Sequence, residues 1–146
     1  MPKVNPNQSQ QRSGATPDEL KYMQHLYQNQ YVLITQELNS RIQALGEITN
    51  SQATLERIDM VKKKKALVPI GAETYLDGTI SDSEAVVVGV GAGYLVEKDV
   101  AGAKAHIAKA IEKETQYINK LMKSKKELEA ALMEVSYKLE ELAHKV

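Results

Sequence analysis

The stretch "ALVPIGAETYLDGTISDSEAVVVGVGAGYLVEKDVAGA", residues 66–103, separates two long helix-forming regions and decides the fold. It is rich in Val, Ile, Tyr and Thr, and Pro69 and several glycines punctuate it. β-branched and aromatic residues favour strands, whereas Gly and Pro mark the turns between them. We therefore predict up to four short strands, arranged as hairpins, at residues 66–68, 73–80, 85–90 and 93–98.

Three glycines at positions 89, 91 and 93 follow a β-branched run, as they would in a phosphate-binding loop. A dinucleotide fingerprint needs G-x-G-x-x-G at the start of a helix. Here Tyr94 follows Gly93 and begins "YLVEK", which is typical of another strand, so no helix N-terminus is available to face a phosphate. We interpret the glycines as a connection where backbones approach closely, and we predict no cofactor.

A capping box marks the start of the first helix. Thr16-Pro17-Asp18-Glu19 supplies a Thr cap, a proline at the first helical position and a Glu three residues after the cap. We expect a helix over residues 17–63, preceded by a polar, disordered tail over residues 1–16. Its apolar seam, with Gln52 as a polar break, comprises Tyr27, Tyr31, Ile34, Leu38, Ile42, Leu45, Ile48, Leu55 and Ile58.

The second helix, expected over residues 100–146, has a cleaner seam. Steps of four and three from Ile107 give twelve positions, of which ten are apolar, so a partner helix is needed to bury them. The polar exceptions, Glu114 and Lys125, can set the register of the pairing at some cost in stability. The full set is Ile107, Ile111, Glu114, Ile118, Leu121, Lys125, Leu128, Leu132, Val135, Leu139, Leu142 and Val146.

The two predicted helices are nearly equal in length, roughly 70 Å each at 1.5 Å per residue. Matching seams and a short, turn-rich connector favour an α+β fold: a long antiparallel two-helix coiled-coil hairpin with a central β-segment of two hairpins. The β-segment would then lie at one end and both chain termini at the other. Pairing of one helix from each of two chains is the alternative. A single domain would cover residues 17–146.

The composition excludes several classes of protein. The chain has 146 residues, which suits one domain, and its 19 basic residues balance its 19 acidic ones. A neutral chain gives no reason to expect a nucleic acid or an acidic membrane as partner, and no run approaches the ~20 apolar residues of a membrane span. The absence of cysteine excludes disulfides and thiolate metal sites. We expect a cytoplasmic protein.

The ionisable residues show no catalytic pattern. The three histidines are scattered, and the carboxylates mostly fall on solvent faces of the helices. The basic run Lys62–Lys65 suits a helix C-terminus, where cations interact favourably with the helix dipole. Contact of these lysines with a phosphate backbone is the alternative interpretation. We predict no enzyme activity, no metal and no nucleic-acid partner.

The strand segment cannot complete a fold within one chain. The run "AVVVGV", residues 85–90, is apolar on both faces of its strand. Four short strands cover neither both faces nor both edges, and an open edge invites pairing. We predict that strands from several chains join in a shared sheet or barrel, with a self-contained β-cap as the alternative. The predicted oligomerisation residues are Leu67, Val68, Ile70, Tyr75, Ile80, Val86, Val87, Val88, Val90, Tyr94 and Val96.

Near the chain termini, apolar residues also occur outside the seam. Examples are Tyr22 and Leu26 on the first helix and Met133 and Tyr137 on the second. A two-helix coiled coil buries only a narrow stripe, so such residues form a candidate contact surface, and Met suits adaptable contacts. The alternative is that they are ordinary, singly exposed apolar residues.

Two pieces of the strand segment, "LVPIGAETYLDGTI" (67–80) and "VGVGAGYLVEKD" (88–99), resemble alpha-class prefoldin subunits, more archaeal than eukaryotic in pattern. The resemblance covers about residues 17–146. It implies a hetero-hexamer of two alpha-class and four beta-class subunits whose hairpins form β-barrels, while the coiled-coil tips hold non-native proteins for a group II chaperonin without ATP. The implied client-binding tip comprises Leu20, Tyr22, Met23, Leu26, Tyr27, Met133, Tyr137, Leu139 and Leu142.

Two alternatives to a client-holding chaperone remain at this point. One is a structural, prefoldin-like subunit that builds scaffolds or filaments and holds no clients. The other is a coiled coil that binds nucleic acid through Lys62–Lys65, which salt-dependent binding would reveal.

Overall fold

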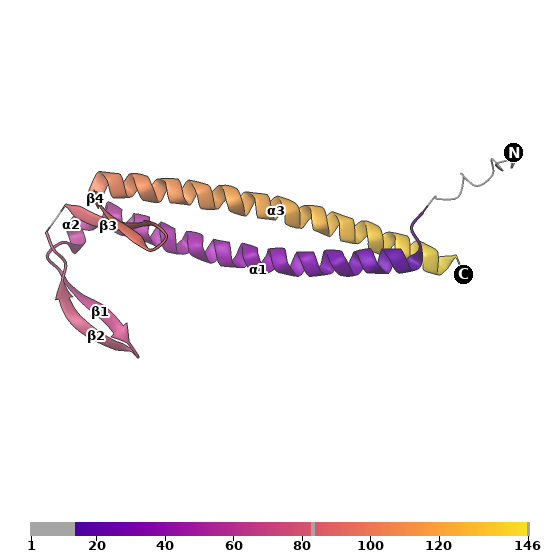
Figure 1. The fold of residues 1–146 in the computed structure, drawn as a ribbon, viewed down its shortest axis with the longest axis horizontal. Coiled ribbons are helices and arrows are strands. Elements are labelled where there is room, and N and C mark those ends of the chain that lie inside the picture. Colours follow the sequence, from indigo (N-terminus) through magenta and orange to yellow (C-terminus); the bar gives the residue numbers. More distant parts are fainter. Residues whose placement is uncertain (1–13, 83, 146) are drawn as a thin grey trace, which may run out of the picture. The chain divides into compact units, whose positions relative to one another are not determined.

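The computed structural model describes residues 14–82 and 84–145. Along the chain, two β-hairpins lie between two long helices, as the α+β prediction requires (Figure 1). The predicted tail over residues 1–16 lies outside the described residues up to position 13, as does the seam residue at 146. In chain order the elements are α1 (Pro17–Glu56), α2 (Ile58–Val61), β1 (Lys65–Gly71), β2 (Thr74–Thr79), β3 (Ala85–Gly91), β4 (Tyr94–Asp99) and α3 (Val100–His144).

The predicted capping box forms at the start of α1. The Glu19 backbone N–H donates a hydrogen bond to the Thr16 hydroxyl at 3.2 Å, and the Thr16 N–H donates to the Glu19 carboxylate at 3.0 Å. Both bonds satisfy backbone donors that have no partner within the helix. The sequence therefore predicted the first residue of this helix correctly.

The chain divides into two compact units, here named the helical unit and the hairpin unit. The described residues of the helical unit are 14–39 and 119–145, the first part of α1 and the last part of α3. The hairpin unit spans Ser40–Ile118 and holds the remaining helical segments and all four strands.

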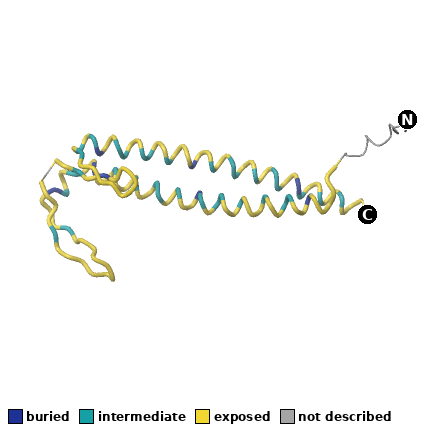
Figure 2. The backbone as a smooth tube through the Cα atoms, viewed as in Figure 1, coloured by how far each residue is buried: buried dark blue, intermediate teal, exposed yellow. Residues whose placement is uncertain are grey.

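In the helical unit the two helix segments pack antiparallel along the predicted seam. Leu20, Leu38 and Val135 are buried there. The Gln24 side-chain amide donates a hydrogen bond to the Ser136 hydroxyl at 3.2 Å, which joins the two helices beside the apolar stripe. Figure 2 shows the regular alternation of buried, half-buried and exposed positions along both helices.

The charged seam residue Lys125 packs against an aromatic ring in the helical unit. The Lys125 ammonium of α3 lies 5.4 Å from the centroid of the Tyr31 ring on α1. The Tyr31 hydroxyl donates a hydrogen bond to the Glu129 carboxylate at 3.3 Å. Lysine above an aromatic face is an attractive arrangement, so Lys125 contributes to the helix pairing despite its charge.

The seam in the hairpin unit corrects one sequence-based assignment. Ile42, predicted to lie in the seam, is 50% exposed, whereas Arg41 is half-buried. The reason is the spacing: from Leu38, a step of three keeps the heptad alternation and lands on Arg41. Arg41 lies 3.6 Å from the Glu114 carboxylate of α3 and 4.6 Å from the centroid of the Tyr117 ring. The two charged seam residues therefore pair with each other.

The first helix also ends earlier than predicted. Instead of reaching residue 63, α1 stops at Glu56, and Arg57 (φ −110°, ψ 25°) separates it from the single turn of α2. The Arg57 N–H donates to the Thr54 carbonyl three residues back, a tighter turn than an α-helix. This break lets Ile58 pack beside Leu55 against the second hairpin.

The strands form two separate antiparallel pairs, β1–β2 and β3–β4, with the same internal design. Each first strand ends in a bulge at a glycine with positive φ, Gly71 (112°) or Gly91 (106°), and these lie 20 positions apart. Two residues with positive φ then make the turn, which is the backbone of a type I′ hairpin. Predicted and observed strands agree within a few residues, and β1 extends further than expected because it continues through Pro69 to Gly71.

The small core of the hairpin unit joins the second hairpin to the helices. Leu55 of α1, Val88 of β3 and Ala103 of α3 are buried together, and Ile58, Val86 and Ile107 pack around them. Asp99 begins the final helix by accepting a hydrogen bond from the Gly102 N–H at 2.7 Å. By contrast, nearly all residues of the first hairpin are exposed.

The ion pair in the seam predicts a coupled effect on stability. Replacing Arg41 by Met should lower the free energy of unfolding by about 1–2 kcal/mol, because Glu114 is then left without its partner. The double variant Arg41→Met/Glu114→Met should recover most of that loss. Chemical denaturation followed by circular dichroism measures both. Losses that simply add in the double variant would contradict the proposed coupling.

The conformation of Glu73 in the turn of the first hairpin predicts that a glycine there would stabilise the hairpin. Glu73 adopts φ 57°, where its counterpart in the second hairpin is Gly93 (φ 78°). A non-glycine residue in this conformation costs about 1 kcal/mol, so Glu73→Gly should slow amide exchange in β1–β2 by roughly fivefold. Thr74→Gly, within strand β2, is the control and should speed exchange. If both variants slow it, turn strain is not the cause.

Candidate interaction surfaces

The β-hairpins carry most of the exposed apolar surface of the hairpin unit. Of the eleven predicted oligomerisation residues, nine are exposed in the single chain. Such a concentration on two small hairpins is typical of a surface that another chain covers. The nine are Leu67, Val68, Ile70, Tyr75, Ile80, Val87, Val90, Tyr94 and Val96.

The other two predicted residues have a role within the chain. Val88 is 8% exposed and Val86 is half-buried, because this face of β3 packs on α1 and α3. They are therefore unavailable to a partner in this arrangement. No local pattern in the sequence distinguishes these two residues from the other nine, since both hairpins carry apolar residues on both faces.

Two exposed residues of the hairpins were missed by the sequence analysis. Leu76 of β2 is 57% exposed and Leu95 of β4 is 71% exposed. Each follows a tyrosine, and alternation along a strand places it on the face opposite that tyrosine. The repeated Tyr-Leu pair was the available signal.

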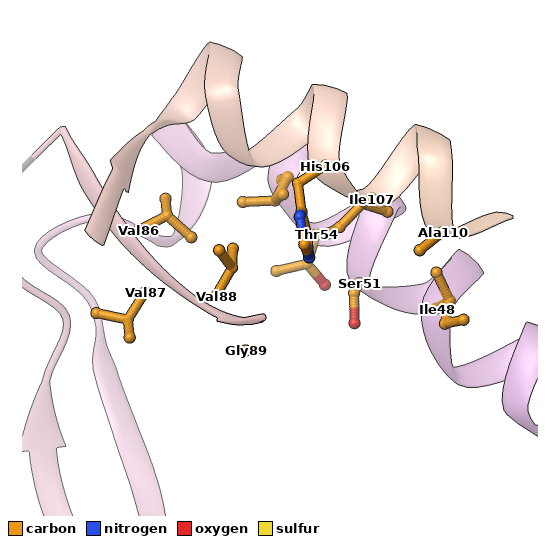
Figure 3. A pocket seen from close by; sticks show the side chains of 11 residues that line it. Ile48, Ser51, Thr54, Val86, Val87, Val88, Gly89, His106, Ile107 and Ala110 are labelled. Atoms are coloured by element: carbon orange, nitrogen blue, oxygen red, sulfur yellow. The ribbon is translucent and has the colours of Figure 1, made fainter. Parts of the chain in front are cut away.

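An open groove of about 460 Å³ lies between β3 and the two long helices (Figure 3). Val86, Val88 and Gly89 form its strand side. Ile48 comes from α1, whereas Ile107 comes from α3. Apolar side chains dominate the lining, and Ser51, Thr54 and His106 add polar atoms.

The basic run at the base of the first hairpin is largely held within the chain. The Lys62 ammonium lies 2.8 Å from Glu84 and 3.7 Å from Asp59, and only 7% of its side chain is exposed. The Lys63 ammonium lies 3.1 Å from Asp82. Half of the run therefore joins the end of α2 to the linker between the hairpins, which weakens the nucleic-acid alternative.

The electrostatics of Lys62 follow from these contacts. Its hydrogen bond to the Glu84 carboxylate raises its pKa above the ordinary value of 10.5, and the charges of Asp59 and Asp82 act in the same direction, while burial opposes them. Because the folded-state pKa is raised, the stabilising contribution is fully present below about pH 10.5. It is lost as the pH rises through the raised pKa.

In the helical unit, the nine predicted tip residues fall into two groups. Tyr22, Leu26, Met133 and Tyr137 are exposed, and Met133 is the most exposed at 75%. The other five, Leu20, Met23, Tyr27, Leu139 and Leu142, are buried or half-buried. Heptad spacing places all of them except Met23 on the seam. Leu20, at 3% exposed, is closed to any partner in this structure.

Three further exposed apolar residues lie in the helical unit: Val32 and Leu33 on α1, and Met122 on α3.

Within residues 14–82 and 84–145, no cluster of three His, Cys, Asp or Glu side chains is arranged to hold a metal ion. In the same part of the chain, no helix has a segment apolar and long enough to cross a bilayer.

Comparison with known proteins identifies relatives over most of the chain. Residues 27–145 match the family model described as prefoldin subunit. The chain is 32% identical over 130 residues to the prefoldin subunit alpha of Pyrococcus horikoshii, covering 88% of each chain. It is 28% identical over 95 residues to prefoldin subunit 5 of Arabidopsis thaliana, covering 64% of this chain and 63% of that protein.

A solved structure shows the same fold. The cryo-EM structure of the filamentous PFD from Methanocaldococcus jannaschii matches with a TM-score of 0.56 and 24% identity, covering 84% of this chain and 97% of that chain. At this identity the likeness is one of fold.

The contacts of Lys62 give a prediction. Glu84→Gln should lower the pKa of Lys62 towards its ordinary value, because the charged hydrogen-bond acceptor is lost. Asp82→Asn should lower it less, since Asp82 acts through its charge alone. Titration of the Lys62 side chain by NMR measures both shifts. Equal shifts in the two variants would contradict the role of the hydrogen bond.

Proposed function

The chain belongs to the prefoldin family, and from this premise we propose that it is the alpha-class subunit of an ATP-independent chaperone that holds non-native proteins in the cytoplasm. Its hairpins would join beta-class subunits, in a hexamer of two alpha-class and four beta-class chains. The helical unit would contact clients and pass them to a group II chaperonin.

The observation that carries this proposal is the exposed apolar surface of the hairpins. Nine of the eleven predicted oligomerisation residues have no cover in the single chain, and Leu76 and Leu95 enlarge the surface. A two-stranded hairpin is marginal in water by itself, so the first hairpin needs other strands or helices to be stable. Assembly with further subunits would cover the apolar residues and provide the first hairpin with neighbouring strands.

Client contact is supported by the exposed residues of the helical unit. Tyr22 and Leu26 lie on α1, and Met133 and Tyr137 lie on α3. These side chains are apolar, and methionine adapts to varied partners. Contacts of this kind are weak singly, but several subunits acting on one client gain strength through effective concentration, which still permits release.

Assembly is tested by native mass spectrometry of the chain mixed with a beta-class prefoldin subunit from the same source. We expect a complex of two chains with four beta-class subunits, because the hairpin surface is then covered. A mixture in which the two proteins stay apart would overturn the proposed hexamer and favour a scaffold-type subunit.

Client holding is tested in the assembled complex. The quadruple variant Tyr22→Ser/Leu26→Ser/Met133→Ser/Tyr137→Ser should assemble normally and suppress the aggregation of a denatured protein at least threefold less well, because the apolar contact area is removed. Light scattering during dilution from denaturant is the measurement.

Exposed apolar residues of the hairpin unit provide the matched control. Ile42 is 50% exposed and Met60 is 71% exposed, so Ile42→Ser/Met60→Ser removes a comparable kind of surface elsewhere. This control should keep full suppression. An assembled quadruple variant that suppresses aggregation as well as the control would show that the client surface is assigned wrongly.

A further inference from the structure

We propose that Met133 and Met122 of the helical unit are oxidation sites, at which a peroxide converts the client-contact surface from apolar to polar and lowers its hold on clients. The inference rests on the proposed function in taking the exposed residues of the helical unit as the client surface. It adds a modification of that surface and a reversible form of regulation. The modifying reagent is hydrogen peroxide, and the product is methionine sulfoxide.

Methionine is the only sulfur-containing residue type in this chain. The sequence holds five methionines and no cysteine. Where a thiolate is present, it reacts with peroxide and the response takes the form of sulfenic acids and disulfides. Here every oxidation of sulfur has to occur at a thioether. Met1 lies outside the described residues, so the structure compares the other four methionines.

Exposure to solvent separates these four side chains. Met133 is 75% exposed, Met60 is 71% exposed and Met122 is 47% exposed, whereas Met23 is half-buried. No other large apolar side chain of the described residues is more exposed than Met133. Oxygen transfer requires the oxidant to reach the sulfur atom, so the exposed thioethers react before the half-buried one.

Met133 and Met122 lie on one face of α3, away from the seam. They are eleven positions apart, which is close to three full turns of an α-helix, and Tyr137 lies one turn beyond Met133. Met133 is exposed although its neighbours along the chain, Leu132 and Val135, are half-buried and buried in the seam. Oxidation on this face therefore changes the surface and leaves the pairing of the helices intact.

The reaction is a transfer of one oxygen atom. The thioether sulfur attacks one oxygen of hydrogen peroxide, an S–O bond forms, the O–O bond breaks, and the second oxygen leaves as water with both protons. Sulfur loses two electrons and the peroxide gains them, while the charge of the side chain stays zero. Two thiols acting through a methionine sulfoxide reductase reverse the step, giving the thioether, a disulfide and water.

A sulfoxide at this surface opposes contact with an apolar client. The sulfoxide oxygen is polar, and its hydration has to be given up when an apolar segment covers it. Met133 is one of the four exposed residues assigned to clients, and Met122 extends the same face. Because several weak contacts act together on one client, weakening one contact in each copy of the chain favours release.

Met60 provides a control within the same molecule. It is nearly as exposed as Met133, but it lies on α2 in the hairpin unit, outside the client surface. Its sulfur is therefore oxidised under the same conditions without altering client contact. A general effect of peroxide on the protein would depend on Met60 as much as on the methionines of α3.

Site-resolved oxidation of the full chain tests the modification sites. The chain is treated with hydrogen peroxide, and peptides are quantified by mass spectrometry over time. Met133 should be oxidised at least threefold faster than Met23, because only its sulfur is open to solvent. Circular dichroism should stay unchanged while Met133 reacts. Equal rates at Met133 and Met23, or a loss of helix in step with oxidation of Met133, would overturn the proposal.

The effect on clients is tested by light scattering with the assembled complex, each variant being compared with its own untreated sample. Peroxide should weaken suppression of aggregation at least twofold in the unmodified complex, because apolar contact area becomes polar. Treatment with the reductase should restore it. The variant Met122→Leu/Met133→Leu should lose less than half as much, since leucine is apolar and has no sulfur. The control Met60→Leu should lose as much as the unmodified complex.

These outcomes separate the inference from the proposed function. If the untreated complex suppresses aggregation and peroxide changes nothing, or if Met122→Leu/Met133→Leu loses as much as the unmodified complex, the oxidation switch is overturned and the chaperone function stands. If the untreated complex fails to suppress aggregation, the proposed function is overturned together with the effect on clients. The rates measured on the chain itself still decide whether Met133 is the preferred site.

Discussion

Burial of one apolar stripe between α1 and α3 is the interaction on which the rest of this structure depends. The chain lacks Phe and Trp, and the buried core of the described residues consists of a few aliphatic side chains, all but Val88 on the long helices. Each long helix would expose its stripe if it stood alone, so tertiary packing rather than helix propensity supplies most of its stability. The second hairpin extends this packing by placing Val88 against Leu55 and Ala103.

Charged residues within the seam specify the register of the two helices, which apolar residues alone would leave free to shift by a heptad. Arg41 meets Glu114 in the hairpin unit, and Lys125 meets Tyr31 in the helical unit. A shift of one helix by a heptad would keep apolar residues in contact but separate these partners. Polar seam residues therefore act against alternative registers, at the cost of burying charge.

The candidate surfaces were only partly predictable from the sequence. The hairpins were recognisable as an interaction surface because four short strands cannot cover their own apolar faces. Most of the residues predicted there are exposed. The division between Val88, which packs inward, and Val87, which is exposed, depends on which face of β3 meets the helices. In the helical unit, Leu20 was grouped with its exposed neighbours although its spacing from Tyr27 places it on the seam.

The sequence by itself determined the order and the approximate position of the elements, because heptad spacing, the Thr16 capping box and the glycine-rich turns are local signals that need no distant partner. It also determined the family, through the two hairpin segments. Only the tertiary structure decided that Arg41 pairs with Glu114 across the seam, and that α1 breaks at Arg57. It alone showed that the second hairpin packs on the helices while the first stays uncovered. Those outcomes depend on which residues meet across the fold, and contacts between distant segments leave no periodic trace in a single chain.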